Sequence, residues 1–211
     1  EQRANGATEA ANLGAVGAIV RSVTTSQDDF PHTGSMRYGT GVPLIPTAGI
    51  STNGANLLSQ KLKENPNLTF YFRQNCETMP DADSHNVVGE IKGSENPDEI
   101  IIVGGHLDSW DLATGATDNG LGSFTIMDIA RTFKTLKIKP KRTIDFVLFM
   151  GEEQGLLGSR QVVKELVKTK QVDKVKFMMN LDMTNNVYGM NVGGRDELIP
   201  FFQSVGEQIK K

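Results

Sequence analysis

From residue 84 onward, short apolar runs alternate with stretches of helical periodicity. The runs have the length and the Val, Ile and Phe content of buried strands, and they lie at 86–91, 100–104, 143–150 and 175–181. A polar turn over 92–99 separates the first two runs, and the helical stretches are 120–136 and 155–168. In the first helix we expect a buried face of Phe124, Met127, Ile129, Ala130 and Phe133. This alternation predicts an α/β fold, with a central mostly parallel or mixed sheet flanked by helices.

Residues 1–80 show a different pattern of shorter elements. We expect a helix over 4–13 and a second helix that Ser51 or Thr52 caps and that runs through Lys63. Short strands are expected at 16–20, 44–48 and 68–73. The polar, turn-rich stretch 74–84 then predicts a linker. The sequence therefore predicts two domains, residues 1–80 and 84–211.

Composition excludes several classes of protein. The 211 residues carry a net charge of −3, which gives no basic footprint for nucleic acid or for an anionic membrane. No apolar run approaches the roughly 20 residues that a membrane-spanning helix needs. Cys76 is the single cysteine, so a disulfide framework is excluded. The chain lacks an initiator methionine and residues 208–211 look like the middle of an amphipathic helix, so we expect a piece of a longer protein.

Acidic residues and one histidine gather where the predicted strands of the second domain end. In chain order they are His106 and Asp108 after the second strand, Asp111 and Asp118 in the following loop, Glu152 and Glu153 after the third strand, and Asp182 after the fourth. In α/β sheets, sites form just beyond the carboxyl ends of the strands. Parallel neighbours lie about 5 Å apart, so we expect these side chains to converge on one small volume.

One imidazole among several carboxylates is a nitrogen and oxygen ligand set, which suits zinc, manganese or cobalt. Carboxylates held this close repel one another unless cations neutralise them. Two divalent ions about 3.5–4 Å apart, bridged by one carboxylate, would resolve the repulsion and are a common arrangement for hydrolysis. The adjacent pair Glu152 and Glu153 permits a division of labour, with one side chain on the metal and the other facing the water.

Each of these residues also has an ordinary structural interpretation. Asp118 or Asn119 would cap the helix at 120–136, and for Asp118 capping and ligation are equally good accounts. Glu152 and Glu153 precede a helix and would favour its macrodipole, and His106 could be a hydrogen-bonded loop histidine. Structural roles alone would require several independent coincidences in one order along the chain. Together the residues favour the metal site.

Four segments carry a resemblance to a known family. GGHLDSWD (104–111), GATDNGLG (115–122), GEEQGLLGS (151–159) and NLDMT (180–184) resemble the co-catalytic zinc aminopeptidases. Within that family, HLDSWD together with PHTG (31–34) and VPLIPTAGIS (42–51) resembles the carboxypeptidase Q branch. The resemblance implies a zinc-exopeptidase fold for residues 84–211. It also implies a smaller protease-associated α+β domain for residues 1–80, with both domains incomplete.

The resemblance implies roles for all of the residues at the strand ends except Asp111, which we take as structural. His106 and Asp182 would bind one zinc ion, Glu153 would bind the second, and Asp118 would bridge the two. Glu152 would be the general base, Asp108 would orient the imidazole of His106, and the peptide bond after Asp118 would be cis. The family also has a late histidine ligand, and the remaining histidines here, His32 and His85, precede the motifs. We therefore expect that ligand beyond Lys211, and two zinc ions in the full-length chain.

The activity implied by the resemblance is metal-dependent hydrolysis of dipeptides, or of peptides with a free N-terminus. The branch is secreted, periplasmic or lysosomal and often forms homodimers. Two alternatives stay open on the same fold. One is acyl transfer of the glutaminyl-cyclase type, and the other is a non-catalytic, receptor-like relative such as the transferrin receptor.

Overall fold

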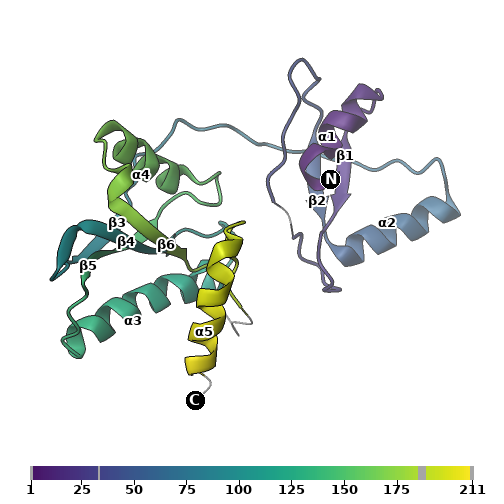
Figure 1. Cartoon of the computed structure of the whole chain (residues 1–211). Helices are drawn as coiled ribbons and strands as arrows, with labels where there is room; N and C mark the ends of the chain where they lie inside the picture. The colour runs from purple at the N-terminus through teal and green to yellow at the C-terminus, as the bar shows by residue number, and fades with distance from the viewer. Residues whose placement is uncertain (1, 33, 185–188, 210–211) are drawn as a thin grey trace. The chain divides into compact units, whose positions relative to one another are not determined.

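Two units, residues 1–81 and 82–211, make up the chain. A computed structural model describes residues 2–32, 34–184 and 189–209, and Figure 1 shows its helices and strands. The expected linker, 74–84, has no regular secondary structure and contains the division between the units. Among the described residues, no helix has the length and apolar character needed to cross a membrane.

The first unit is a small α/β arrangement around one pair of strands. Its elements are α1 (Gln2–Asn12), β1 (Ala18–Arg21), β2 (Thr47–Ile50) and α2 (Thr52–Glu64), and β1 and β2 are parallel. Ser51 caps α2, since its hydroxyl accepts a hydrogen bond from the Gly54 amide at 3.0 Å. The strand predicted at 68–73 is wrong. Phe70 and Tyr71 of this run are 57% and 85% exposed, so the run buries little apolar surface, and an extended segment without such packing does not form a stable strand.

The second unit is built on a mixed four-stranded sheet. Its strands are β3 (Val87–Ile91), β4 (Asn96–His106), β5 (Arg142–Phe149) and β6 (Val175–Asn180), in the order β3-β5-β4-β6. β4 runs parallel to both neighbours, and β3 is antiparallel to β5. The predicted mixed sheet flanked by helices is thus confirmed. The turn predicted over 92–99 is shorter than expected, because β4 already begins at Asn96 and reaches its regular register through an irregularity before Ile100.

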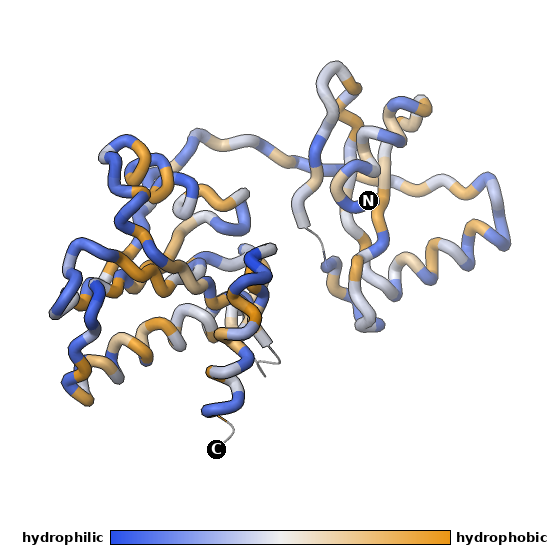
Figure 2. Tube along the Cα trace, viewed as in Figure 1, coloured by the Kyte–Doolittle hydropathy of each residue, from blue (hydrophilic) through white to orange (hydrophobic). Residues whose placement is uncertain are grey.

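Two helices cover the sheet from opposite faces (Figure 1). α3 (Gly122–Thr135) places Ile126 in a core with Ile144, Phe146, Leu148 and Leu181, and α4 (Leu157–Lys168) packs Val162 on a second core of Ile102, Val147 and Phe149. Figure 2 shows the hydrophobic residues of this unit gathered along the strands and on α3. The remaining elements are the turns η1 (Ala116–Leu121), η2 (Val172–Lys174) and η3 (Asp196–Leu198), and the last helix, α5 (Ile199–Ile209).

The buried face predicted for α3 needs correction at two positions. Ile129, Ala130 and Phe133 pack against the core as expected, but Phe124 is 71% exposed and Met127 is 44% exposed. The innermost residue is Ile126, at 1% exposure. Residues of an α-helix follow one another at about 100°, so Phe124 lies nearly opposite Ile126 and Met127 stands to one side.

Candidate metal centre

The site begins where β4, β5 and β6 end side by side. His106, the last residue of β4, pairs in register with Phe149 of β5, and Gly104 pairs with Asn180 of β6. The residues that follow each strand therefore leave the sheet at one edge, as the sequence predicts for parallel neighbours.

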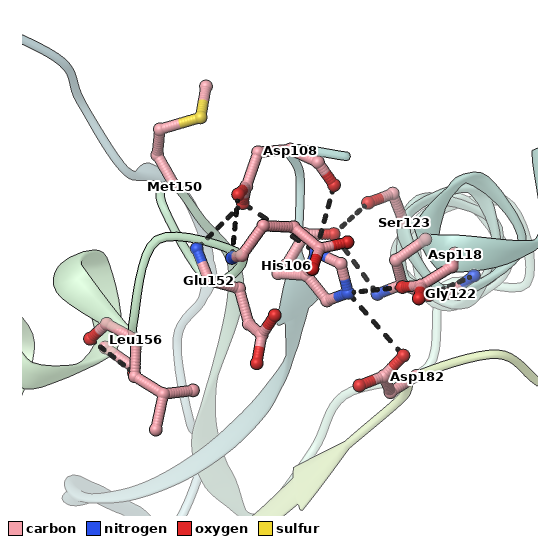
Figure 3. Close-up of polar contacts among 12 residues, drawn as sticks. His106, Asp108, Asp118, Gly122, Ser123, Met150, Glu152, Leu156 and Asp182 are labelled. Atoms are coloured by element: carbon pink, nitrogen blue, oxygen red, sulfur yellow. Dashed lines mark hydrogen bonds and ion pairs between the residues drawn. The ribbon is translucent and has the colours of Figure 1, made fainter. Parts of the chain in front are cut away.

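His106 lies at the centre of the cluster and is only 3% exposed. Its Nε2 atom lies 2.9 Å from Oδ1 of Asp118, which the turn η1 supplies, and 3.5 Å from Oδ1 of Asp182, which follows β6. Figure 3 shows both carboxylates pointing toward this nitrogen of the imidazole. A neutral nitrogen lone pair and an ionised oxygen at 2.9 Å would repel, so the contact calls for a proton or a cation between them.

The other ring nitrogen is held by the backbone. Nδ1 of His106 lies 3.0 Å from the carbonyl oxygen of Asp108 and 3.7 Å from its Oδ1 atom. A carbonyl oxygen only accepts, so this contact places the proton on Nδ1 and leaves Nε2 of the neutral ring free to bind a cation. The orienting contact expected from the Asp108 carboxylate is thus made at shorter range by the Asp108 carbonyl.

The Asp108 carboxylate instead holds the turn after β5. Its Oδ1 accepts a hydrogen bond from the Glu152 amide at 3.0 Å, and its Oδ2 accepts one from the Glu153 amide at 3.1 Å (Figure 3). Gly151, which starts this turn, has a φ of +73°, a conformation that costs glycine little. The turn thereby brings both glutamates to the edge where His106 lies.

Glu153 completes a tight group of ligand atoms. One atom each from His106, Asp118 and Glu153 lie within 4.8 Å of one another. Oε1 of Glu153 is buried and has no hydrogen-bond partner among the described residues. A buried carboxylate oxygen without a partner is costly, and a divalent cation would satisfy it. The donor set of one imidazole nitrogen and several carboxylate oxygens suits zinc.

The electrostatics of the group point the same way. Burial alone lowers the pKa of His106, but the carboxylates of Asp182, Glu152, Asp118 and Asp108 outweigh it, so the pKa of His106 is raised. For Glu153, burial first and then the nearby Asp118 and Glu152 carboxylates raise the pKa. The cluster thus concentrates negative charge around one partly buried point, which is what a cation site requires.

Two expectations about helix capping and backbone geometry have clear outcomes here. The side chain that accepts an amide of the first turn of α3 is that of Asn119, whose Oδ1 accepts from Gly122 at 3.2 Å. Asp118 faces His106 instead. The peptide bond between Asp118 and Asn119 is cis, as the resemblance implies.

Asn119 was not among the predicted site residues, yet its side chain makes several contacts at the site. It is 2% exposed and bonds to backbone groups of His106, Leu181, Gly122 and Met183. The available signal was an amide between an acidic residue and glycine in the segment 115–122. Of the other histidines, His85 is exposed, and His32 of the first unit pairs with Asp28 at 3.0 Å.

The comparison with protein families decides the identity of the second unit. The model of peptidase family M28 matches residues 86–204, which is more than half of the chain and includes His106 and all six acidic residues that follow the strands. The chain belongs to peptidase family M28. The fold described above is accordingly that of an M28 peptidase.

Named relatives in family M28 agree with this assignment. Carboxypeptidase Q of Xenopus laevis is 41% identical over 196 residues, which cover 92% of this chain and 41% of that protein. Human carboxypeptidase Q is also 41% identical, over 76% of this chain and 34% of its own length. Leucine aminopeptidase 1 of Trichophyton rubrum is 36% identical over 68% of this chain. The chain spans about two fifths of the length of these relatives.

Solved M28 structures share the fold. A peptidase M28 precursor from Shewanella amazonensis superimposes with a TM-score of 0.75 at 39% identity, covering 86% of this chain and 40% of that one. A zinc aminopeptidase from Bacillus subtilis gives a TM-score of 0.68 over 96% of this chain. Its identity is 24%, so it supports the fold alone.

Proposed function

We propose that the full-length protein is a zinc-dependent exopeptidase that hydrolyses dipeptides or peptides with a free N-terminus. The observation that carries this proposal is the group of His106, Asp118 and Glu153, together with the buried Oε1 of Glu153, which has no hydrogen-bond partner in the part of the chain that the structure describes. The names of the relatives, carboxypeptidase Q and leucine aminopeptidase, support the exopeptidase class.

Two zinc ions would be shared among four residues. His106 and Asp182 would hold one ion, Glu153 would hold the other, and Asp118 would bridge them. The 2.9 Å and 3.5 Å approaches of Asp118 and Asp182 to Nε2 of His106 support the grouping of these three. A further histidine from the rest of the full-length protein would complete the second site. When bound, zinc would supply polarisation of the substrate carbonyl and a lowered pKa for water.

Glu152 would move the proton. It follows β5 next to Glu153, and its backbone amide is anchored by Asp108, so its carboxylate is presented at the same edge as the metal ligands. Glu152 would accept a proton from the attacking water and then deliver it to the leaving amine. The backbone amide of Glu153 is also held by the Asp108 carboxylate. The proposed base, Glu152, and the proposed ligand, Glu153, are therefore fixed relative to each other.

The proposal extends to the first unit and to location. Residues 1–80 would form the protease-associated domain of the carboxypeptidase Q branch, with the protein acting outside the cytoplasm and as a homodimer. The zinc site would lie in the second unit, where all the proposed ligands of this chain are found.

Metal content and peptide hydrolysis together test the function. The experiment measures zinc by elemental analysis on the full-length protein and on residues 1–211, and follows cleavage of unblocked dipeptides. We expect about two zinc ions per full-length chain with dipeptide cleavage, and fewer ions in the shorter piece. A full-length protein that stays free of metal after zinc loading would instead favour the non-catalytic, receptor-like alternative. Zinc with glutaminyl cyclisation and no cleavage would favour the cyclase alternative.

A further inference from the structure

The side chain of Asn119 continues the sheet beyond the point where strands β4 and β6 stop pairing. The last register pair is Gly104 with Asn180, followed by a hydrogen bond from the Leu181 amide to the Gly104 carbonyl at 2.8 Å. Past that point, Nδ2 of Asn119 donates to the His106 carbonyl at 3.1 Å and to the Leu181 carbonyl at 2.9 Å. The side-chain amide of Asn119 therefore connects the ends of β4 and β6 at the point where their backbone hydrogen bonding stops.

The oxygen of the same side-chain amide also makes two hydrogen bonds. Oδ1 accepts from the backbone amide of Gly122 at 3.2 Å and from that of Met183 at 3.2 Å. An asparagine side chain offers two donors and two acceptor positions, and all four are engaged. The residue is 2% exposed, so these bonds are made away from water.

Two glycines leave room for this amide. A Cβ on Gly105 would lie 2.4 Å from the Leu181 carbonyl oxygen and 3.1 Å from Nδ2 of Asn119. A Cβ on Gly122 would lie 2.3 Å from Oδ1 of Asn119 and 2.4 Å from the Leu181 oxygen. Backbone atoms cannot move aside as a flexible side chain would, so the close approach depends on both positions being glycine.

We propose that Asn119 is a positioning residue that fixes His106 and Asp182 relative to each other, and both relative to Asp118. The backbone carbonyl of His106 accepts a hydrogen bond from the side-chain amide of Asn119. Asp182 lies between Leu181 and Met183, and the backbone groups of these two neighbours are hydrogen-bonded to the Asn119 side chain. Asp118 directly precedes Asn119 in the chain. The inference rests on the proposed function, because it assigns these residues as the ligands that Asn119 places.

A carboxamide is the side chain that this position needs. Aspartate has the same shape and keeps the acceptor for Gly122 and Met183, but it would turn an oxygen toward the two carbonyls of His106 and Leu181. Leucine has a similar volume and would leave all four backbone groups without their partner. Both variants should shift the ligands without removing any of them.

Zinc affinity and the cobalt spectrum of the full-length protein test the inference. We expect Asn119→Asp and Asn119→Leu to bind zinc about 10–100-fold more weakly in competition with a chromophoric chelator, the usual effect of losing a residue that orients ligands. The visible absorption bands of the cobalt(II)-loaded variants should shift in energy or intensity, since these bands report ligand geometry.

Thr143→Val provides the matched control. Thr143 is 1% exposed and bonds to two backbone groups, donating to the Pro97 carbonyl at 2.7 Å and accepting from the Gly93 amide at 3.1 Å, at the opposite end of β5. The Thr143→Val variant should lower the unfolding temperature of the metal-free protein while leaving zinc affinity and the cobalt spectrum unchanged.

The outcomes separate the inference from the proposed function. If the wild-type protein binds zinc and a folded Asn119 variant keeps both the wild-type affinity and the wild-type cobalt spectrum, the positioning role is wrong. If the leucine variant does not fold, the aspartate variant decides, because it keeps the volume and the acceptor. A wild-type protein that binds no zinc would overturn the proposed function itself.

Discussion

The carboxylate of Asp108 accepts a hydrogen bond from the backbone amide of Glu152 at 3.0 Å. Its second oxygen accepts from Glu153 at 3.1 Å, while the Asp108 carbonyl lies 3.0 Å from Nδ1 of His106. Hydrogen bonds from backbone amides to an ionised carboxylate are among the stronger ones in proteins. One residue therefore ties the imidazole at the end of β4 to the pair of glutamates after β5, and the two strand exits behave as one unit.

Replacing the Asp108 carboxylate should disturb catalysis more than metal content. In Asp108→Asn, one side-chain oxygen would become an NH₂ group facing a backbone N–H, so one of the two anchoring bonds is lost. We expect kcat of the full-length enzyme to fall about 10–100-fold, the range for residues that orient a metal site, with zinc largely retained. Asp111→Asn, in the exposed part of the same loop, is the control and should keep kcat. Equal kcat in the two variants would contradict the anchoring role.

The adjacent glutamates should fail in different ways when each is changed to glutamine. Glu152→Gln removes the proposed base, so kcat should fall about 10²–10⁴-fold while zinc content stays at the wild-type value. Glu153→Gln removes the charge of the carboxylate whose Oε1 is buried without a partner among the described residues, so zinc content should fall. Elemental analysis beside steady-state kinetics distinguishes the two. Near-normal turnover in Glu152→Gln, or full zinc content in Glu153→Gln, would show that the roles are assigned wrongly.

The convergence of His106, Asp118 and Glu153 could be predicted from sequence because it depends on strand order and strand polarity. Alternating apolar runs and helices indicate parallel neighbours, and parallel neighbours end at the same edge. For His106 and Glu153, which lie at or just after strand ends, that argument needs little knowledge of loop paths, whereas Asp118 reaches the site through the turn η1. It places residues at the site without fixing which atom contacts which, and the metal-binding roles themselves stay predictions.

Contacts that depend on the path of a turn were not predicted from the sequence. The Asp108 carboxylate bonds to the Glu152 and Glu153 amides because the turn after Gly151 brings those amides to it. The four backbone bonds of Asn119 likewise exist only after two strands and a helix have come together. The strand predicted at 68–73 is wrong for a related reason, since the pattern of the run does not show whether its apolar side chains are buried, and Phe70 and Tyr71 are exposed.

Asp145 should make the protein less stable at neutral pH. It stands opposite Glu90 in the antiparallel pair of β5 and β3, and burial, followed by repulsion from Glu90, raises its pKa, against a smaller opposing effect of Lys92. A carboxyl whose pKa is higher in the folded state binds more protons there, so stability falls as pH rises from about 3.8 through the raised value. Asp145→Asn removes that loss.

The expected gain for Asp145→Asn at pH 7 is about 0.2–1 kcal/mol, the scale of cross-strand charge pairs. Urea unfolding at pH 7 and at steps down to pH 4 measures it, and the gain should shrink toward the acid end. Glu90→Gln should give a smaller gain, because it relieves the repulsion but not the burial of the Asp145 charge, and the double variant should gain less than the sum of the two. A gain that is constant across this pH range would mean that the charge of Asp145 is not its source.

A single methyl group added at Gly105 should disturb the site. A Cβ there would lie 2.4 Å from the Leu181 carbonyl oxygen, and moving that oxygen means separating β4 from β6 where His106 and Asp182 leave the sheet. Overpacking of this kind costs about 1–3 kcal/mol or more, so Gly105→Ala should lower the free energy of unfolding by about that amount and weaken zinc binding.

Gly89→Ala, in β3, is the matched control because nothing lies within 4 Å of its Cβ. Alanine is favoured over glycine in a strand by about 0.5–1 kcal/mol, so this variant should be as stable as the wild type or more so. Urea unfolding and chelator competition on both variants decide the matter: equal stability and equal zinc affinity would mean that the strands can separate at Gly105 without cost, and that the close approach of β4 and β6 does not hold the ligands in place.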